Sequence, residues 1–307
     1  MNTKMKGIIC GIISAITYGL NPLGALKLYS NGLNVDSVMF YRYGLAMILL
    51  AGIMLFQKMS FNIGRQKLLI CALLGIIFAI ASISLFSSFY YMDAGVACTL
   101  LFIYPVLVAI IMSLFFKEQI TIITVFSIIM VLMGIGLLYY GGEGMVLSIV
   151  GVLLVMLSAF AYAVYIVIVS KSGVNLPPIT LTFFVMLFGT LTIILHSFIR
   201  DEYHIQMLTN LWQLQWVIML AVVPTIISLV LMVVAIKNIG SIPTSIMGAL
   251  DPVTAVVIGV TIFNESFTLR IAMGMVLILV AVLLIIIEKP LISRLKNRHL
   301  LNLKADI

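Results

Sequence analysis

The chain has 307 residues, of which 64% are hydrophobic and 9% are charged, and its net charge is +7. Soluble domains typically hold about 25% charged residues, so a chain with so few charges cannot cover a water-exposed surface. The composition therefore excludes an ordinary soluble protein, and the positions of the basic residues, described below, argue against a nucleic-acid partner.

Charged residues divide the chain into long apolar windows, each near the roughly 20 residues that a helix needs to cross a bilayer. In chain order, seven uncharged windows cover 7–26, 68–92, 94–116, 119–142, 144–170, 172–199 and 205–236. Three more spans are expected near 37–56, near 243–263 and from about 269 to 287. The apolar runs are continuous, whereas barrel strands alternate. We therefore predict an all-α membrane protein with ten transmembrane helices.

The first window also has some features of a signal peptide, because Lys4 and Lys6 precede it. It is long enough to span, so we expect it to be retained as the first transmembrane helix.

Basic residues predict the orientation. With the N-terminus in the cytoplasm, thirteen Lys and Arg residues fall on the cytoplasmic side, and only Lys27, Arg200 and Arg270 fall on the other. Because Lys and Arg concentrate in cytoplasmic loops, we place both ends in the cytoplasm and the protein in the cell (inner) membrane. The basic tail, 289–307, is expected to lie against anionic headgroups, which explains the net charge without nucleic acid.

The sequence contains an internal repeat. Three residue pairs lie 147 positions apart: Pro105 and Pro252, Glu118 and Glu265, Thr121 and Thr268. Five more lie 144 positions apart: Gly7 and Gly151, Ser14 and Ser158, Ala15 and Ala159, Tyr18 and Tyr162, Lys27 and Lys171. Each copy holds five spans, so the second copy must enter the membrane from the opposite side. We predict two inverted five-helix repeats, 6–141 and 145–288, as in many transporters; a duplicated scaffold without transport is the alternative.

These motifs resemble the EamA transporters of the drug/metabolite transporter superfamily. The matching features are the proline in each fourth helix, the Glu-x-x-Thr at each following turn, Arg42 in the second helix, and the aromatic-bearing first helices at 14–18 and 158–162. Asp251 before the second proline also fits. Lys117 and Asn264 depart from the pattern, because the family usually has glycine there. The resemblance covers roughly 6–288.

The resemblance implies a basket of ten helices with a central cavity lined mainly by helices 1, 3, 4, 6, 8 and 9, and with helices 5 and 10 at the periphery. It also implies secondary transport, often export, of amino acids or other metabolites. We therefore expect a secondary transporter that exports an amino acid or amine by alternating access. A lipid or polar-headgroup flippase and a non-enzymatic membrane scaffold are the alternatives. The expected partners are the solute and membrane lipid, with the chain as a monomer or homodimer.

Motifs of enzymes are missing from the sequence. It has no His-Glu-x-x-His, no Gly-x-Ser-x-Gly and no phosphate-binding loop, and its histidines, at 196, 204 and 299, are scattered near membrane edges. We expect no catalytic activity, no cofactor and no metal site.

Two charged residues lie clearly inside spans, where a charge costs about 2.5–3.5 kcal/mol on insertion scales. Asp251 is eight residues beyond Pro243, hence about 12 Å deep at 1.5 Å per residue, near the midplane of a layer about 30 Å thick. We hypothesise that it faces the cavity and either binds a substrate amine or carries a proton. The alternative is a neutral, hydrogen-bonded core carboxyl. The equivalent residue in the first repeat is Tyr104.

Arg42 lies about five residues into its span from the outer face. Its long side chain can reach back to the interface, pair with Asp36 or Asp93, or receive a substrate carboxylate. Structural anchoring is the favoured interpretation.

The remaining candidates are polar residues and prolines. Glu118 and Glu265 are expected to be structural, each at the start of a helix with Thr121 or Thr268 in its first turn. Prolines in membrane helices mark kinks near a pathway, and the candidates are Pro22, Pro105, Pro224 and Pro252. The residues expected to line the cavity are Tyr18, Asn21, Ser84, Thr99, Tyr104, Tyr162, Tyr165, Ser228 and Thr244. For each of them, hydrogen bonding between helices is an equally good interpretation.

Overall fold

The computed structural model describes residues 2–92, 94–118, 120–138, 148–199, 205–251, 253–254, 257, 269–270 and 272–284. Within these ranges every regular element is a helix and none is a strand. Six of the helical segments are long and apolar enough to cross a membrane, and shorter apolar helices lie between them. The chain is therefore an all-α, multi-pass membrane protein, as the sequence predicts.

The first half of the chain begins with a broken span. Helix α1 (Thr3–Tyr18) and α2 (Asn21–Tyr29) are separated by two residues, and Pro22 lies in the first turn of α2. The second and third spans are the uninterrupted helices α3 (Val35–Phe56) and α4 (Arg65–Ser88).

The fourth span is also broken. It consists of α5 (Ala94–Leu101) and α6 (Tyr104–Phe116), and Pro105 lies in the first turn of α6. Proline lacks a backbone N–H, so a helix begins at it more readily than it continues through it. The fifth span is α7 (Ile122–Leu138).

The second half has its breaks at other positions. Helices α8 (Ile149–Lys171) and α9 (Pro178–Ile199) are uninterrupted. The eighth span consists of α10 (Leu211–Ala221), the π-helical turn η1 (Val222–Ile227) and α11 (Ser228–Ile239). Pro224 lies inside η1, which is a usual cause of such a distortion. The ninth span begins with α12 (Ser241–Met247), and Ala272–Leu284 is a further apolar helix.

The boundaries correct four predicted windows. The first, fourth and eighth spans are not single helices, because a proline interrupts each of them. The predicted window 172–199 becomes a helix only at Pro178, and the window 205–236 only at Leu211. Asn210 is the N-cap of α10, because its side-chain oxygen accepts a hydrogen bond from the backbone N–H of Gln213 at 2.8 Å.

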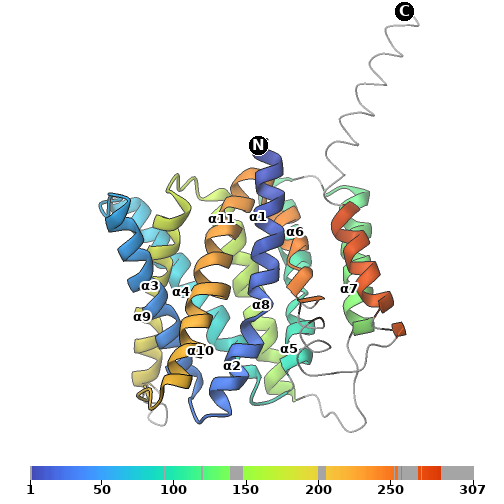
Figure 1. Cartoon of the computed structure of the whole chain (residues 1–307). Coiled ribbons are helices and arrows are strands. Elements are labelled where there is room, and N and C mark those ends of the chain that lie inside the picture. Colours follow the sequence, from blue (N-terminus) through green and yellow to red (C-terminus); the bar gives the residue numbers. More distant parts are fainter. Residues whose placement is uncertain are drawn as a thin grey trace, which may run out of the picture.

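Helix packing follows the internal repeat. Helix α1 packs along α11, and α4 packs along α8, while α3 packs along α9 (Figure 1). Exchanging spans 1, 2 and 3 with spans 6, 7 and 8 converts the α1–α11 contact into the α8–α4 contact and leaves the α3–α9 contact unchanged. Two hydrogen bonds repeat in the same way. Ser14 donates to the carbonyl of Ser228 at 2.8 Å, and Ser158 donates to the carbonyl of Ala81 at 2.7 Å. The serines lie 144 positions apart and the acceptors 147, the same two offsets as in the sequence.

The outer surface is apolar and the interior holds the polar groups. Phe56, Ile122 and Phe198 are at least three-quarters exposed, as expected of side chains that face lipid. Helix α7 lies at one edge of the bundle beside Ala272–Leu284 (Figure 1). There a Cβ on Gly134 would come within 2.8 Å of the Gly274 carbonyl oxygen, so glycine allows the two backbones to approach.

Candidate functional site

Aromatic rings from three spans meet in the middle of the bundle. The Tyr18 ring of α1 stacks on the Tyr162 ring of α8, with centroids 6.0 Å apart and an angle of 8° between the planes. The Tyr104 ring of α6 meets Tyr162 edge-on, at 4.9 Å and 67°. The Tyr104 hydroxyl donates a hydrogen bond to the Ser245 carbonyl at 3.0 Å, so it joins the fourth span to the ninth.

Asp251 lies beside this aromatic cluster. Its charge acts on Tyr18, Tyr104 and Tyr162. The Oδ1 atom is buried and has no hydrogen-bond partner among the described residues. A buried polar atom without a partner is costly. Oδ1 therefore has unused hydrogen-bonding capacity in the part of the chain that the structure describes.

Tyr18 and Asp251 form a wall shared by two small cavities. One has a volume of about 20 Å³ and is also lined by Ser14, Tyr104, Tyr162, Ser228 and Thr244. The other has a volume of about 40 Å³ and is also lined by Asn21, Pro22, Leu85, Phe89, Cys98 and Phe102. These residues come from spans 1, 3, 4, 6, 8 and 9, the set that the resemblance implies. Each of these two cavities has room for water only.

Most hydroxyl groups in the wall are engaged in helix packing. The Ser228 hydroxyl donates to the Ser14 carbonyl at 3.0 Å, and Thr244 donates to the carbonyl of Gly240 at 2.7 Å. Asn21 differs, because it is 2% exposed and neither its Nδ2 nor its Oδ1 has a hydrogen-bond partner among the described residues. Asn21 and Asp251 are therefore the groups in this wall with unused hydrogen-bonding capacity.

Arg42 is fully buried. Its Nε donates to the Thr225 hydroxyl at 2.6 Å, and its guanidinium carbon lies 5.6 Å from the ring centre of Tyr43 and 5.4 Å from that of Phe86. Nη1 and Nη2 have no hydrogen-bond partner among the described residues. The guanidinium also interacts with Tyr18, so Tyr18 lies within reach of both Arg42 and Asp251.

Two expectations for Arg42 are wrong. The side chain does not reach the interface, because the ring of Phe86 and the π-helical turn that carries Thr225 hold it inside the bundle. It does not pair with Asp36 either, since that carboxylate contacts His196. Asp93 lies outside the described residues.

Other predicted residues lie away from the two cavities. Tyr165 is buried behind Tyr162 and packs on Phe78 with ring centres 5.0 Å apart. Ser84 is buried but lines a different cavity, near Asp36. The side chain of Thr99, and Pro252, Glu265, Thr268 and the tail 289–307, lie outside the described residues.

The first-repeat turn motif has structural contacts. The Glu118 carboxylate lies 3.4 Å from the Lys171 ammonium, and both side chains are partly exposed. The Thr121 hydroxyl accepts a hydrogen bond from the Thr124 backbone N–H at 3.1 Å, so it caps α7 from the residue before its first turn.

Sequence reasoning missed several residues of this site. Ser14, Ser245, Gly248 and Cys98 line the cavities, although none of them is charged or aromatic. Ser14 did carry a signal, because it recurs at Ser158 in the repeat. Gly248 is tight against Tyr104, and a Cβ there would collide with the Tyr104 hydroxyl.

A polytopic bundle with two equivalent sets of helices and buried polar groups at its centre is typical of membrane transporters. The chain belongs to the EamA-like transporter family, whose model matches residues 5–140 and again 149–287. It is also similar to a solved structure described only as a protein crystal structure, with 14% identity and a TM-score of 0.74, covering 91% of this chain and 95% of the other. That likeness supports the fold alone. None of the curated proteins compared with the chain matched it.

The contact between Gly248 and Tyr104 gives a testable prediction. Gly248→Ala is expected to displace Tyr104 from its hydrogen bond with Ser245 and to reduce transport in proteoliposomes by about tenfold or more, the loss that follows from removing about 1.4 kcal/mol of favourable interaction. Adding Tyr104→Phe removes the colliding oxygen and is expected to restore part of the activity. If the double variant is no more active than Gly248→Ala alone, the collision is not the cause.

Proposed function

We propose that the chain is a secondary transporter of an amino acid or related amine, exporting it by alternating access of the repeats 6–141 and 145–288. The observation that carries the proposal is a pair of buried polar groups on either side of Tyr18. Among the described residues, Nη1 and Nη2 of Arg42 and Oδ1 of Asp251 have no hydrogen-bond partner within bonding distance. Arg42 interacts with Tyr18, and Asp251 lines both small cavities with it. A zwitterion offers a carboxylate for the first and an ammonium group for the second.

Arginine suits the carboxylate, because its planar guanidinium can donate two parallel hydrogen bonds to it. Nε donates to Thr225, whereas Nη1 and Nη2 have no partner within bonding distance in the described part of the chain. Asp251 suits an ammonium group, and the neighbouring rings of Tyr18, Tyr104 and Tyr162 add cation–π attraction. An amine that has no carboxylate group would bind to Asp251 and would not contact Arg42.

The small size of the central cavities supports alternating access. The two cavities are too small for an amino acid, so the solute can enter only when Tyr18 and Asp251 separate from the facing helices. Pro22, Pro105 and Pro224 lie at the breaks of the three spans that surround the site and are candidate hinges. Under the same proposal both chain ends lie in the cytoplasm, and Asp251 can also carry a coupling proton.

Counterflow in proteoliposomes tests the proposal. Vesicles with the purified chain are loaded with one unlabelled amino acid or amine at a time and diluted into the labelled form, with and without a pH gradient. At least one compound is expected to accumulate above empty vesicles. If the whole panel fails while the same vesicles scramble fluorescent phospholipids, the flippase interpretation replaces this one. Comparing inside-out with right-side-out vesicles tests the direction.

A further inference from the structure

A larger cavity lies at one end of the bundle, apart from the central site. Its volume is about 190 Å³. Residues near the start of α3 and near the ends of α4 and α9 line it, at the end of the bundle opposite to the start of α1. Helix α4 separates it from the centre. Ser84 and Ser87 of that helix face this cavity, whereas Leu85 and Phe89 face the central one.

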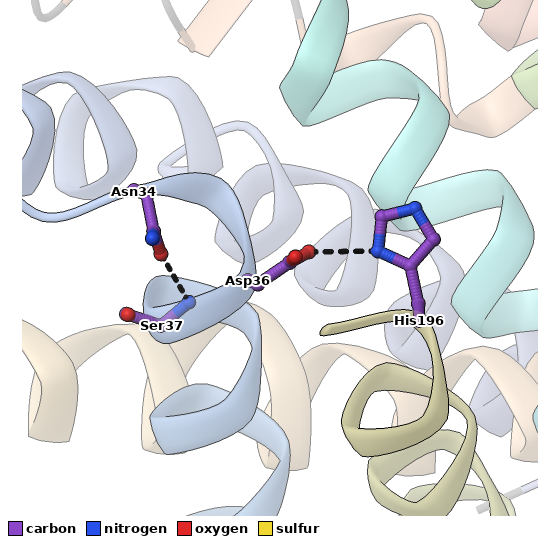
Figure 2. Close-up of polar contacts among 4 residues, drawn as sticks. All are labelled: Asn34, Asp36, Ser37 and His196. Carbon is purple, nitrogen blue, oxygen red and sulfur yellow. Dashed lines mark hydrogen bonds and ion pairs between the residues drawn. The ribbon is translucent and has the colours of Figure 1, made fainter. Parts of the chain in front are cut away.

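A buried carboxylate points into this cavity. Asp36 is 2% exposed, and its Oδ1 lies 3.0 Å from Nδ1 of His196 (Figure 2). Its Oδ2 is buried and has no hydrogen-bond partner in the part of the chain that the structure describes. Asp36 lies in the first turn of α3, where Asn34 caps the helix by accepting from the Ser37 backbone N–H at 2.8 Å. Negative charge is favourable at a helix N-terminus, and the unused Oδ2 can accept a hydrogen bond.

His196 holds this acceptor in place without having to neutralise it. A neutral imidazole with its proton on Nδ1 can donate to Asp36 Oδ1 and leave the carboxylate charge available. The second ring nitrogen points away from Asp36 (Figure 2). The His196 side chain is 31% exposed, so the cavity is reachable from its open side.

The rest of the wall combines aromatic, hydroxyl and apolar groups. Tyr90 and Tyr91 provide ring faces that attract cations, and Ser84 and Ser87 provide hydroxyls. Val150 and Leu154 of α8 provide an apolar side. Among the described lining residues, one carboxylate, aromatic faces and an apolar wall suit a monovalent organic cation. The volume is below the range of about 300–1,000 Å³ for drug-sized ligands, so the cation must be small.

We propose that this cavity is a second binding site, for a small organic ammonium ion whose N–H groups donate to Asp36 Oδ2 and whose carbon chain lies on Val150 and Leu154. Helices α3 and α4 belong to the first repeat, and α8 and α9 to the second. A ligand held by all four helices stabilises the closed arrangement of this end of the bundle. The site does not depend on the transport proposed for the centre.

The experiment titrates n-butylammonium chloride into the full-length chain in lipid nanodiscs by calorimetry, at constant ionic strength. Saturable binding is expected, and Asp36→Asn is expected to weaken it by at least about tenfold, because a charge-assisted hydrogen bond is lost. Glu118→Gln, which removes an acid from an ion pair at the other end of the bundle, is the matched control and should bind as the native chain does. 1-Butanol, the neutral analogue, should show no saturable binding.

Ser87→Leu keeps the proposal testable if Asp36→Asn fails to fold, because it fills the cavity while leaving Asp36 and His196 in place. It is expected to abolish the same binding. Absence of saturable binding to the native chain overturns the proposal. So does binding that persists in Asp36→Asn and Ser87→Leu but is lost in Asp251→Asn, since the amine would then occupy only the central site. Counterflow is measured on the same samples, so that loss of transport can be distinguished from loss of amine binding at this cavity.

Discussion

Arg42→Met is expected to abolish transport of carboxylate-bearing solutes while leaving the protein as stable as the native chain, or more stable. The native guanidinium is fully buried with two unpartnered nitrogens. Taking a charge out of water costs several kcal/mol, and this cost is not offset where no counter-charge is paired with it. Methionine has a similar length and can lie between Tyr43 and Phe86. Thr225 remains satisfied, because its hydroxyl also donates to the Leu220 carbonyl at 2.7 Å.

The expected loss of transport is large. Removing one partner of a buried charge pair costs about 2–5 kcal/mol, and each 1.4 kcal/mol is tenfold, so uptake should fall by about 100-fold or more. Arg42→Lys keeps the positive charge but loses the planar guanidinium group. Its uptake is expected to lie between that of the native chain and that of Arg42→Met. The measurements are counterflow and the thermal unfolding midpoint in detergent. Lys67→Met, the same kind of change at an exposed residue of α4, is the control.

Two results would contradict this role for Arg42. Native transport by Arg42→Met would show that the guanidinium does not contact the solute. A sharp fall in the unfolding midpoint would show instead that its hydrogen bond to Thr225 and its ring contacts anchor the bundle, which is the interpretation favoured by the sequence.

The sequence could predict the features that depend on local composition. Apolar windows are sufficient to locate the spans, and a charge inside such a window identifies Arg42 and Asp251, because hydrocarbon excludes charges that have no role. Repeated positions identify Tyr18 and Tyr162, which stack on one another at the centre.

Other features depend on which face of a helix meets which neighbour, and a continuously apolar helix does not reveal its faces. Ser84 was expected in the central cavity, but one side of α4 faces the centre and the other faces Asp36. Asp36 and His196 are 160 residues apart and join only because α3 packs along α9. Neither residue belongs to a recognisable motif.

The repeats supply a symmetric scaffold, and the chemistry of the centre departs from that symmetry. Ser14 and Ser158 make equivalent hydrogen bonds in the two halves. At the central cavity the two repeats differ. Tyr104 of the first repeat corresponds to Asp251 of the second, and the two residues line the same small cavity. The two repeats therefore differ at this position, with a carboxyl group in the second and a phenol in the first. Under the proposed function, this difference would orient a solute between Asp251 and Arg42.

Asp251→Asn tests that asymmetry and is the second variant with a large expected effect. Asparagine has nearly the same shape but no charge, and the native Oδ1 has no hydrogen-bond partner to lose. The unfolding midpoint should therefore stay the same or rise. Transport of amine-bearing solutes should fall by about 100-fold, because the ammonium group loses a buried counter-charge worth about 2–5 kcal/mol.

Two assays separate the two roles proposed for Asp251. If the carboxylate binds the amine, Asp251→Asn loses both counterflow and uptake driven by a pH gradient. If it carries only a coupling proton, counterflow survives because exchange needs no net proton movement, and gradient-driven uptake alone is lost. Glu118→Gln, which removes a carboxylate that already pairs with Lys171, should leave both assays unchanged. Native behaviour of Asp251→Asn in both assays would remove Asp251 from the transport mechanism and leave a buried core carboxyl as its only role.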